Sequence, residues 1–235
     1  MDVFLVPIGV DAYELYCEHV DEPEAPPEEP TSGFWARLNP AFLFRRLKYR
    51  FHEMLVEAER ERRREHVVTD ESGWFRRAKR RMMRWVAESI AEQRLLWNLR
   101  RHHEATLNHP DDMGAEAADA VTRRQLTRDF EKHRFWLAID SVLLLLSALL
   151  ILVPGPNFIG YYFAFRVVGH FFSVRGARNG LDRVTWTKAP NAPLTDLRRA
   201  LALDPVGRLR EAEAVASRLR LDHLATFFQR TALSQ

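Results

Sequence analysis

Hydrophobic positions recur at three- or four-residue spacing along much of the chain, a period typical of α-helices. One such stripe runs over 75–97 and predicts a helix over about 72–107. An earlier helix is expected over about 40–66, because Asn39 is a good helix cap and Pro40 suits the first helical position. A further helix should begin near Gly114 and continue without a break into an apolar stretch.

The two ends of the chain depart from this pattern of long helices. Residues 3–8 form a short apolar run before a glycine, which predicts one strand, and residues 11–19 are expected to form a short helix. At the other end, short helices are expected over 195–203 and 204–219, the second with an Asp-Pro start. Asp222 is a candidate cap for a third.

The most apolar part of the chain consists of two segments separated by a Pro-Gly-Pro-Asn turn. Residues 135–153 measure about 28 Å as a helix, close to the thickness of a bilayer's hydrocarbon layer, and residues 158–174 measure about 25 Å. The turn at 154–157 breaks the helix. The pattern predicts a helical hairpin that crosses a membrane. The alternative is a hairpin buried in the core of a soluble helical protein.

Three polar residues lie within these apolar segments. By helical rise, Asp140 and His170 lie about 20 Å from the turn and Arg166 about 13 Å from it. Charges at such depth are costly and need a partner, water or a route to the headgroups. An Asp and a His at matching depth could pass a proton. The alternative places Asp140 and His170 at the interface, with Arg166 extending to the headgroups.

These patterns predict a mainly α protein with long helices, a central apolar membrane hairpin, a short N-terminal strand and a small C-terminal helical module. The acidic, Pro-rich stretch before residue 34 cannot pack a core and is expected to be a linker. The expected segments are a strand and helix at 1–20, the linker at 21–33, a basic helical region at 34–134, the hairpin at 135–174, a basic linker at 175–193 and the helical module at 194–235.

Composition and the N-terminal residues narrow the cellular setting. The 235 residues contain 35 Lys and Arg against 32 Asp and Glu, a net charge of +3. The one cysteine, Cys17, excludes an internal disulfide and any CxxC metal or redox motif. The first residues lack both the basic start and apolar core of a secretory signal and the Arg-rich character of a mitochondrial transit peptide. We therefore expect no cleaved targeting segment.

Basic residues flank the hairpin on both sides and are missing from its turn, which places both termini in the cytoplasm by the positive-inside rule. The flanking residues are Arg123, Arg124, Arg128, Lys132 and Arg134 before the hairpin, and Arg175, Arg178, Arg183 and Lys188 after it.

A second group of basic residues is interleaved with aromatic and methionine side chains between positions 74 and 85. A cationic helix of this kind can lie among anionic headgroups, with each basic residue contributing about 1 kcal/mol. Nucleic-acid binding uses the same residue types, so composition alone does not separate the two partners. Beside a membrane hairpin the headgroups are the nearest polyanion, which makes nucleic acid the less favoured partner. The basic cluster consists of Arg76, Arg77, Lys79, Arg80, Arg81 and Arg84.

No residue pattern indicates an enzyme, a metal site or a cofactor. Histidines and aspartates between 102 and 112 match neither zinc nor calcium spacing, and Cys17 has neighbouring acids but no oxyanion element. We therefore expect no catalytic residues. The first group is His102, His103, His109, Asp111 and Asp112, and the neighbours of Cys17 are Glu14, Glu18 and His19.

The stretch over 157–181, NFIGYYFAFRVVGHFFSVRGARNGL, resembles the signature of the mitochondrial potassium/proton exchange-related family. The shared pattern is an Asn after a proline-containing turn, an aromatic run, an Arg, a His four residues later, and then a Gly. The strand followed by YELY at 13–16 and the terminal FFQRTALSQ are similar to the family's two ends. The motif positions are Asn157, Tyr161, Tyr162, Phe163, Arg166, His170 and Gly176.

This resemblance implies a membrane protein that supports potassium/proton exchange as an accessory or assembly component. One hairpin is too little to form a transport path alone, so a homo-oligomer or other membrane subunits are expected. Because a transit peptide is missing, we expect a bacterial cytoplasmic membrane. One alternative is a membrane anchor or scaffold whose basic helices bind anionic lipid or a protein partner. A weaker one is a nucleic-acid-binding helical protein.

Overall fold

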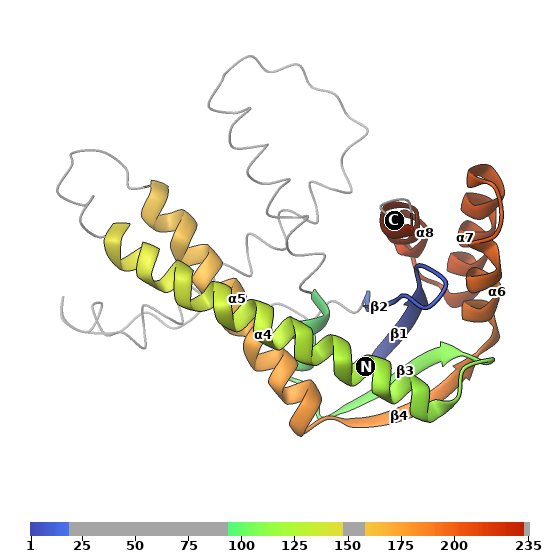
Figure 1. Ribbon diagram of the computed structural model, residues 1–235, viewed down its shortest axis with the longest axis horizontal. Coiled ribbons are helices and arrows are strands. Elements are labelled where there is room, and N and C mark those ends of the chain that lie inside the picture. The colour runs from blue at the N-terminus through green and yellow to red at the C-terminus, as the bar shows by residue number, and fades with distance from the viewer. Residues whose placement is uncertain (19–93, 148–157, 233–235) are drawn as a thin grey trace, which may run out of the picture. The chain divides into compact units, whose positions relative to one another are not determined.

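A computed structural model describes residues 1–18, 94–147 and 158–232 of the chain (Figure 1). The chain divides into two units, and these residues belong to the unit formed by 1–20 and 94–235. The expected linker at 21–33, the expected helix over 40–66 and the basic cluster at 76–84 all lie outside the described residues.

A four-stranded sheet with the order β2-β1-β3-β4 forms the centre of the described unit. β1 pairs antiparallel with β2 and parallel with β3, and β3 pairs parallel with β4. Parallel neighbours need a long crossover, and between β3 and β4 that crossover is a pair of helices. The strands are β1 (Asp2–Pro7), β2 (Tyr13–Tyr16), β3 (Glu104–Pro110) and β4 (Thr185–Asn191).

The strand expected over 3–8 is confirmed, whereas the helix expected over 11–19 is wrong. β2 occupies that segment because the backbone N–H groups of Ile8 and Gly9 donate to the carbonyl of Ala12 and turn the chain back on itself. The helix expected to reach residue 107 is also wrong at its end. Helical structure is described over 94–99, and β3 follows it.

Besides the helical segment 94–99, the described part of the chain contains five labelled helices. They are α4 (Ala115–Ser147), α5 (Phe158–Asp182), α6 (Ala192–Ala200), α7 (Pro205–Leu219) and α8 (Leu224–Ala232).

α4 begins where the sequence predicts, and it runs unbroken into the apolar stretch. The segment over 175–193 is not a linker, because α5 continues to Asp182 and β4 follows.

Local contacts fix the starts of the two last helices. The carboxylate of Asp204 accepts hydrogen bonds from the backbone N–H groups of Val206 and Gly207, so the predicted cap of α7 is confirmed. The carboxylate of Glu18 accepts from the backbone N–H groups of Asp222 and His223, just before α8. The C-terminal helices are thereby joined to the N-terminal hairpin of strands.

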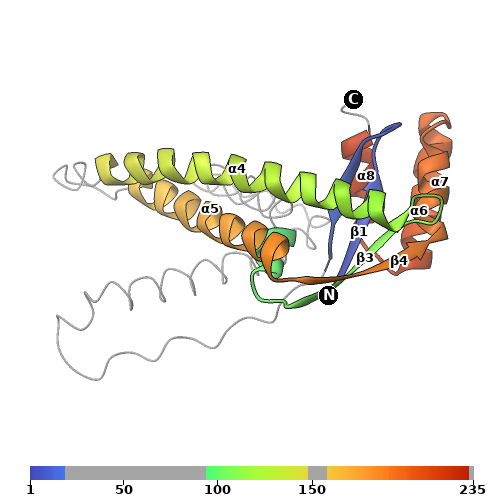
Figure 2. The same ribbon diagram turned by 60° about the horizontal axis from the view of Figure 1, so that its bottom comes forward.

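β1 contributes to two separate cores because successive side chains of a strand point to opposite faces. Val3 and Leu5 pack with residues of α4, α5 and the 94–99 segment. Phe4 and Val6 pack with α6, α7 and α8. The sheet therefore has the α4–α5 pair on one face and the three short helices on the other (Figure 2).

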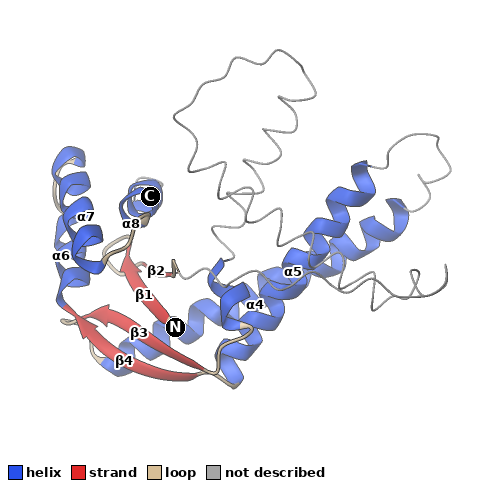
Figure 3. Cartoon of the chain, turned by 180° about the vertical axis from the view of Figure 1, so that it is seen from behind, coloured by secondary structure: helices blue, strands red, loops and turns tan. Residues whose placement is uncertain are grey.

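The two long helices pack against each other as a helical hairpin (Figure 3). The expectation that this hairpin crosses a membrane is not supported: no helix among the described residues combines the necessary length with sufficient apolarity. The described apolar part of α4 is short and follows Lys132 and Arg134, and α5 contains Arg166 and Arg175. Residues 148–157, which include the turn, lie outside the description.

Candidate functional site

The second half of α4, residues 133–147, buries polar side chains and exposes apolar ones. His133, Asp140 and Ser147 are buried, and they lie on one face because each is two helical turns from the next. Apolar residues instead cover the outside, with Leu145 74% and Val142 57% exposed. Phe135, Trp136 and Leu146 are also exposed. This half of α4 thus turns polar side chains inward and apolar side chains outward, the reverse of an ordinary helix in water.

A buried ion pair joins the two helices of the hairpin. The guanidinium Nε of Arg166, on α5, donates to Oδ2 of Asp140, on α4, across 2.9 Å. Arg166 also donates to the hydroxyl of Tyr162 one turn earlier, and its guanidinium lies 5.5 Å from the ring centroid of Trp136. The Asp140 side chain is 2% exposed and that of Arg166 is 23% exposed. Each charge therefore has its partner inside the hairpin.

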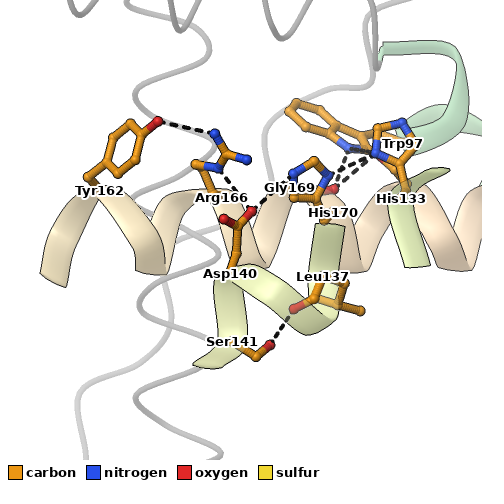
Figure 4. A network of polar contacts seen from close by, with 10 residues as sticks. Trp97, His133, Leu137, Asp140, Ser141, Tyr162, Arg166, Gly169 and His170 are labelled. Atoms are coloured by element: carbon orange, nitrogen blue, oxygen red, sulfur yellow. Dashed lines mark hydrogen bonds and ion pairs between the residues drawn. The ribbon is translucent and has the colours of Figure 1, made fainter. Parts of the chain in front are cut away.

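His170 connects this ion pair to His133, so that four side chains are linked (Figure 4). Its Nε2 lies 3.2 Å from Oδ2 of Asp140. Its Nδ1 lies 2.8 Å from Nδ1 of His133, which comes from α4. Both ring nitrogens of His170 thus contact titratable groups, and the chain Asp140–His170–His133 connects the carboxylate to a second imidazole.

Burial favours the neutral form of both histidines by lowering the pKa of each. Burial, with smaller contributions from His170 and Lys132, lowers the pKa of His133 to about 3. Burial also lowers the pKa of His170, an effect that Asp140 opposes and that Arg166 and Lys132 reinforce. Because Asp140 favours the charged form of His170 alone, an added proton is better stabilised on His170 than on His133.

The 94–99 segment holds α5 at the level of His170. The indole N–H of Trp97 donates to the carbonyl of Gly169 and to Oγ of Ser173, at 3.1 and 3.0 Å. Farther along α5, a Cβ at Gly176 would lie 1.6 Å from the carbonyl oxygen of Leu96. Gly176 is thus required for the close approach of the two backbones.

The structure brings together Asp140, Arg166 and His170, the three polar residues that the sequence singled out. Among the motif positions, Tyr162 contacts Arg166 and Gly176 serves packing. Asn157 lies outside the described residues, and so does the side chain of Tyr161.

The residue that sequence reasoning missed is His133, which precedes the apolar run. Its spacing of two helical turns from Asp140 places both side chains on one face of α4, and this was the available signal.

The histidines and aspartates between 102 and 112 have structural contacts. Nδ1 of His109 contacts the carbonyl of Pro110, Asp111 accepts from the hydroxyl of Thr195, and Asp112 pairs with Arg198. In the described ranges, no three His, Cys, Asp or Glu side chains are grouped so that they could hold a metal ion.

A family model described as mitochondrial K+-H+ exchange-related matches residues 2–184. The chain belongs to this family. The match includes the strands β1 to β3 and the whole hairpin, and it ends just before β4, so the three C-terminal helices lie beyond it. No curated protein and no solved structure matches the chain.

Proposed function

We propose that this protein is a membrane-associated factor of potassium/proton exchange, which acts as an accessory or assembly component. In this proposal the α4–α5 hairpin enters the apolar layer of the membrane from one face, and Asp140, Arg166 and His170 form its polar centre. The observation that carries the proposal is the inverted half of α4, in which Asp140 is buried and paired with Arg166 while large apolar side chains are exposed. Membership of a potassium/proton exchange-related family also supports a role in that exchange.

The exposed apolar surface on α4 is unfavourable in water. Full burial of a large apolar side chain contributes roughly 1.5–3 kcal/mol, and Phe135, Val142, Leu145 and Leu146 are each more than half exposed. Their transfer from water into hydrocarbon is therefore worth about 5 kcal/mol in total. A continuous apolar surface of this kind is typical of a membrane or partner contact.

The interior of the hairpin suits the same environment. An unpaired charge in hydrocarbon is very costly, whereas Asp140 and Arg166 form an ion pair with each other. Exposed basic side chains, including Lys132 and Arg134, precede this apolar surface along α4. Such residues favour an anionic headgroup layer. We propose a bacterial cytoplasmic membrane, with both termini on its cytoplasmic side, as the setting.

Flotation with liposomes tests the membrane part of the proposal. The full-length protein is mixed with vesicles of phosphatidylcholine and phosphatidylglycerol and separated on a density gradient. Leu145→Asp places a charge on the outer surface of α4 and should abolish most of the flotation. Leu203→Asp is the matched control, because Leu203 is an exposed leucine outside the hairpin. Equal flotation of the two variants would contradict the proposed surface.

Potassium tolerance tests the physiological part. Cells that lack the chain are complemented with the wild-type protein, with His170→Asn, or with His103→Gln, which changes an exposed histidine outside the hairpin. His170→Asn should accumulate and fail to restore growth at high potassium, whereas His103→Gln should restore it. Full restoration by His170→Asn would instead favour a scaffold that binds lipid or a partner.

A further inference from the structure

The contact between the two histidines requires one specific arrangement of hydrogens. A hydrogen bond between two imidazole nitrogens needs a donor on one side and a lone pair on the other. The Nδ1 atoms of His133 and His170 lie 2.8 Å apart, so one of them carries a hydrogen and the other does not. The other nitrogen of His170 settles which one it is.

Asp140 determines the tautomer of His170. Oδ2 of Asp140 already accepts the N–H of Arg166 Nε across 2.9 Å, and a carboxylate oxygen only accepts hydrogen bonds. Nε2 of His170, 3.2 Å from that carboxylate, must therefore carry its hydrogen. Neutral His170 then has a lone pair on Nδ1, and His133 donates to it from its own Nδ1. This leaves Nε2 of His133 as the unprotonated end of the chain.

We propose that His133 and His170 form a one-proton site, in which His133 accepts a proton at Nε2 and passes a different proton to His170. The proton that arrives forms an N–H bond at Nε2 of His133. The hydrogen on Nδ1 of His133 then moves to Nδ1 of His170. His133 ends neutral in its opposite tautomer, and His170 becomes an imidazolium between His133 and the carboxylate of Asp140.

The site takes one proton because its geometry leaves no place for a second. After the transfer, Nδ1 of His133 is the acceptor of the 2.8 Å hydrogen bond. Protonating it would set two N–H groups and two positive charges against each other inside the hairpin. A second proton therefore requires α4 and α5 to separate.

The charged groups around the pair favour the same single occupancy. On α4, Lys132 disfavours a second positive charge, and Asp129 lies one turn before His133. On α5, Arg166 also disfavours it, although its charge is balanced by Asp140. The 94–99 segment contributes Trp97, whose neutral indole holds Gly169 and Ser173 beside His170. Of these groups, Asp140 is the carboxylate in contact with the pair, and it contacts His170 alone, so the contact favours an imidazolium at that one ring.

The purpose of this site rests on the proposed function, but its chemistry does not. In potassium/proton exchange, a site that fills with one proton on acidification supplies a step at which the proton is taken up or sensed. The lowered pKa of His170 keeps the site empty at neutral pH, so it fills only when its surroundings become acidic.

The tautomer of His133 tests the proposal directly. The full-length protein with ¹⁵N-labelled histidine is examined by NMR in detergent micelles as the pH is lowered from 8 to 4, with His103 as an exposed reference. At neutral pH, His133 should carry its hydrogen on Nδ1, a tautomer that free imidazole side chains disfavour. As His170 becomes an imidazolium, the hydrogen of His133 should change to Nε2.

Two results would overturn the proposal. One is a His133 that carries its hydrogen on Nε2 at neutral pH, and the other is a pair in which both rings become imidazolium while the hairpin stays folded. His133→Asn gives a second test, since its amide N–H can donate to Nδ1 of His170 but has no second nitrogen that accepts a proton. In this variant neutral His170 should keep its hydrogen on Nε2. A hydrogen on Nδ1 would contradict the role assigned to Asp140.

These measurements use neither lipid vesicles nor potassium. A confirmed tautomer change with normal potassium tolerance of His170→Asn would leave the one-proton site standing and remove the proposed function. If instead the tautomer of His133 does not change and His170→Asn fails to restore potassium tolerance, the one-proton site is refuted and the proposed function stands.

Discussion

Removing one partner of the Asp140–Arg166 ion pair should lower the free energy of unfolding more than removing both partners together. Breaking a buried ion pair by removing one partner typically costs about 3–5 kcal/mol, because the other charge remains without compensation. Arg166→Gln leaves the carboxylate of Asp140, 2% exposed, with His170 as its remaining contact. We therefore expect Arg166→Gln to lower the free energy of unfolding by about 3–5 kcal/mol. Asp140→Asn should cost about 2–3 kcal/mol, because Arg166 is partly exposed and keeps its contacts with Tyr162 and Trp136.

The double variant Asp140→Asn/Arg166→Gln removes both charges and should cost about 1 kcal/mol, less than either single change. Pulse proteolysis of the full-length protein over a urea series, in mild detergent, measures the fraction unfolded for all four proteins. The difference between the double variant and the sum of the single variants gives the coupling energy. A double variant whose cost equals that sum would refute the account, since the two side chains would then act independently.

Three further predictions concern the packing and titration of the same region. Gly176→Ala should destabilise the protein by about 3 kcal/mol, because the new Cβ overlaps the carbonyl of Leu96, whereas Gly114→Ala, which meets no atom within 4 Å, should change the urea midpoint little. Trp97→Phe keeps an aromatic ring but loses both hydrogen bonds of the indole, and should cost about 2 kcal/mol by the same assay. Stability should fall on acidification, because the pKa of His133 is lowered from 6.5 to about 3 and the unfolded chain therefore binds more protons between these values. The contribution of His133 is complete above pH 6.5, and on the order of 4 kcal/mol is lost as the pH falls toward about 3. His133→Asn should flatten the dependence of the urea midpoint on pH, and an unchanged slope would contradict the assignment.

The helical hairpin was predictable because its signals are local. The start of α4 and the helical period of both helices lie within short stretches of sequence. The sheet was largely missed because pairing between parallel strands joins residues far apart in the chain. β3 follows a segment with helical period and alternates buried and less buried positions over only seven residues. Such a short alternation is hard to separate from the helical pattern before it.

The candidate site was predictable in part. Equal distances from the turn place Asp140 and His170 side by side on antiparallel helices, and the two side chains do meet. Arg166 lies one turn closer to the turn, but its long side chain reaches back to Asp140. His133 lies just before the apolar run, so the apolar pattern does not include it. The predicted membrane crossing depends on the apolar stretch 135–153. Residues 148–153 of that stretch lie outside the described residues.

Potassium-driven proton movement tests the central claim most directly. Everted membrane vesicles from cells that lack the chain are supplied with the wild-type protein, His170→Asn or His103→Gln, and a pH-sensitive dye reports proton movement after potassium is added. The account predicts that the wild-type protein and His103→Gln restore potassium-dependent proton exchange, whereas His170→Asn, present in equal amount, does not. Equal exchange with His170→Asn and with the wild-type protein would contradict it.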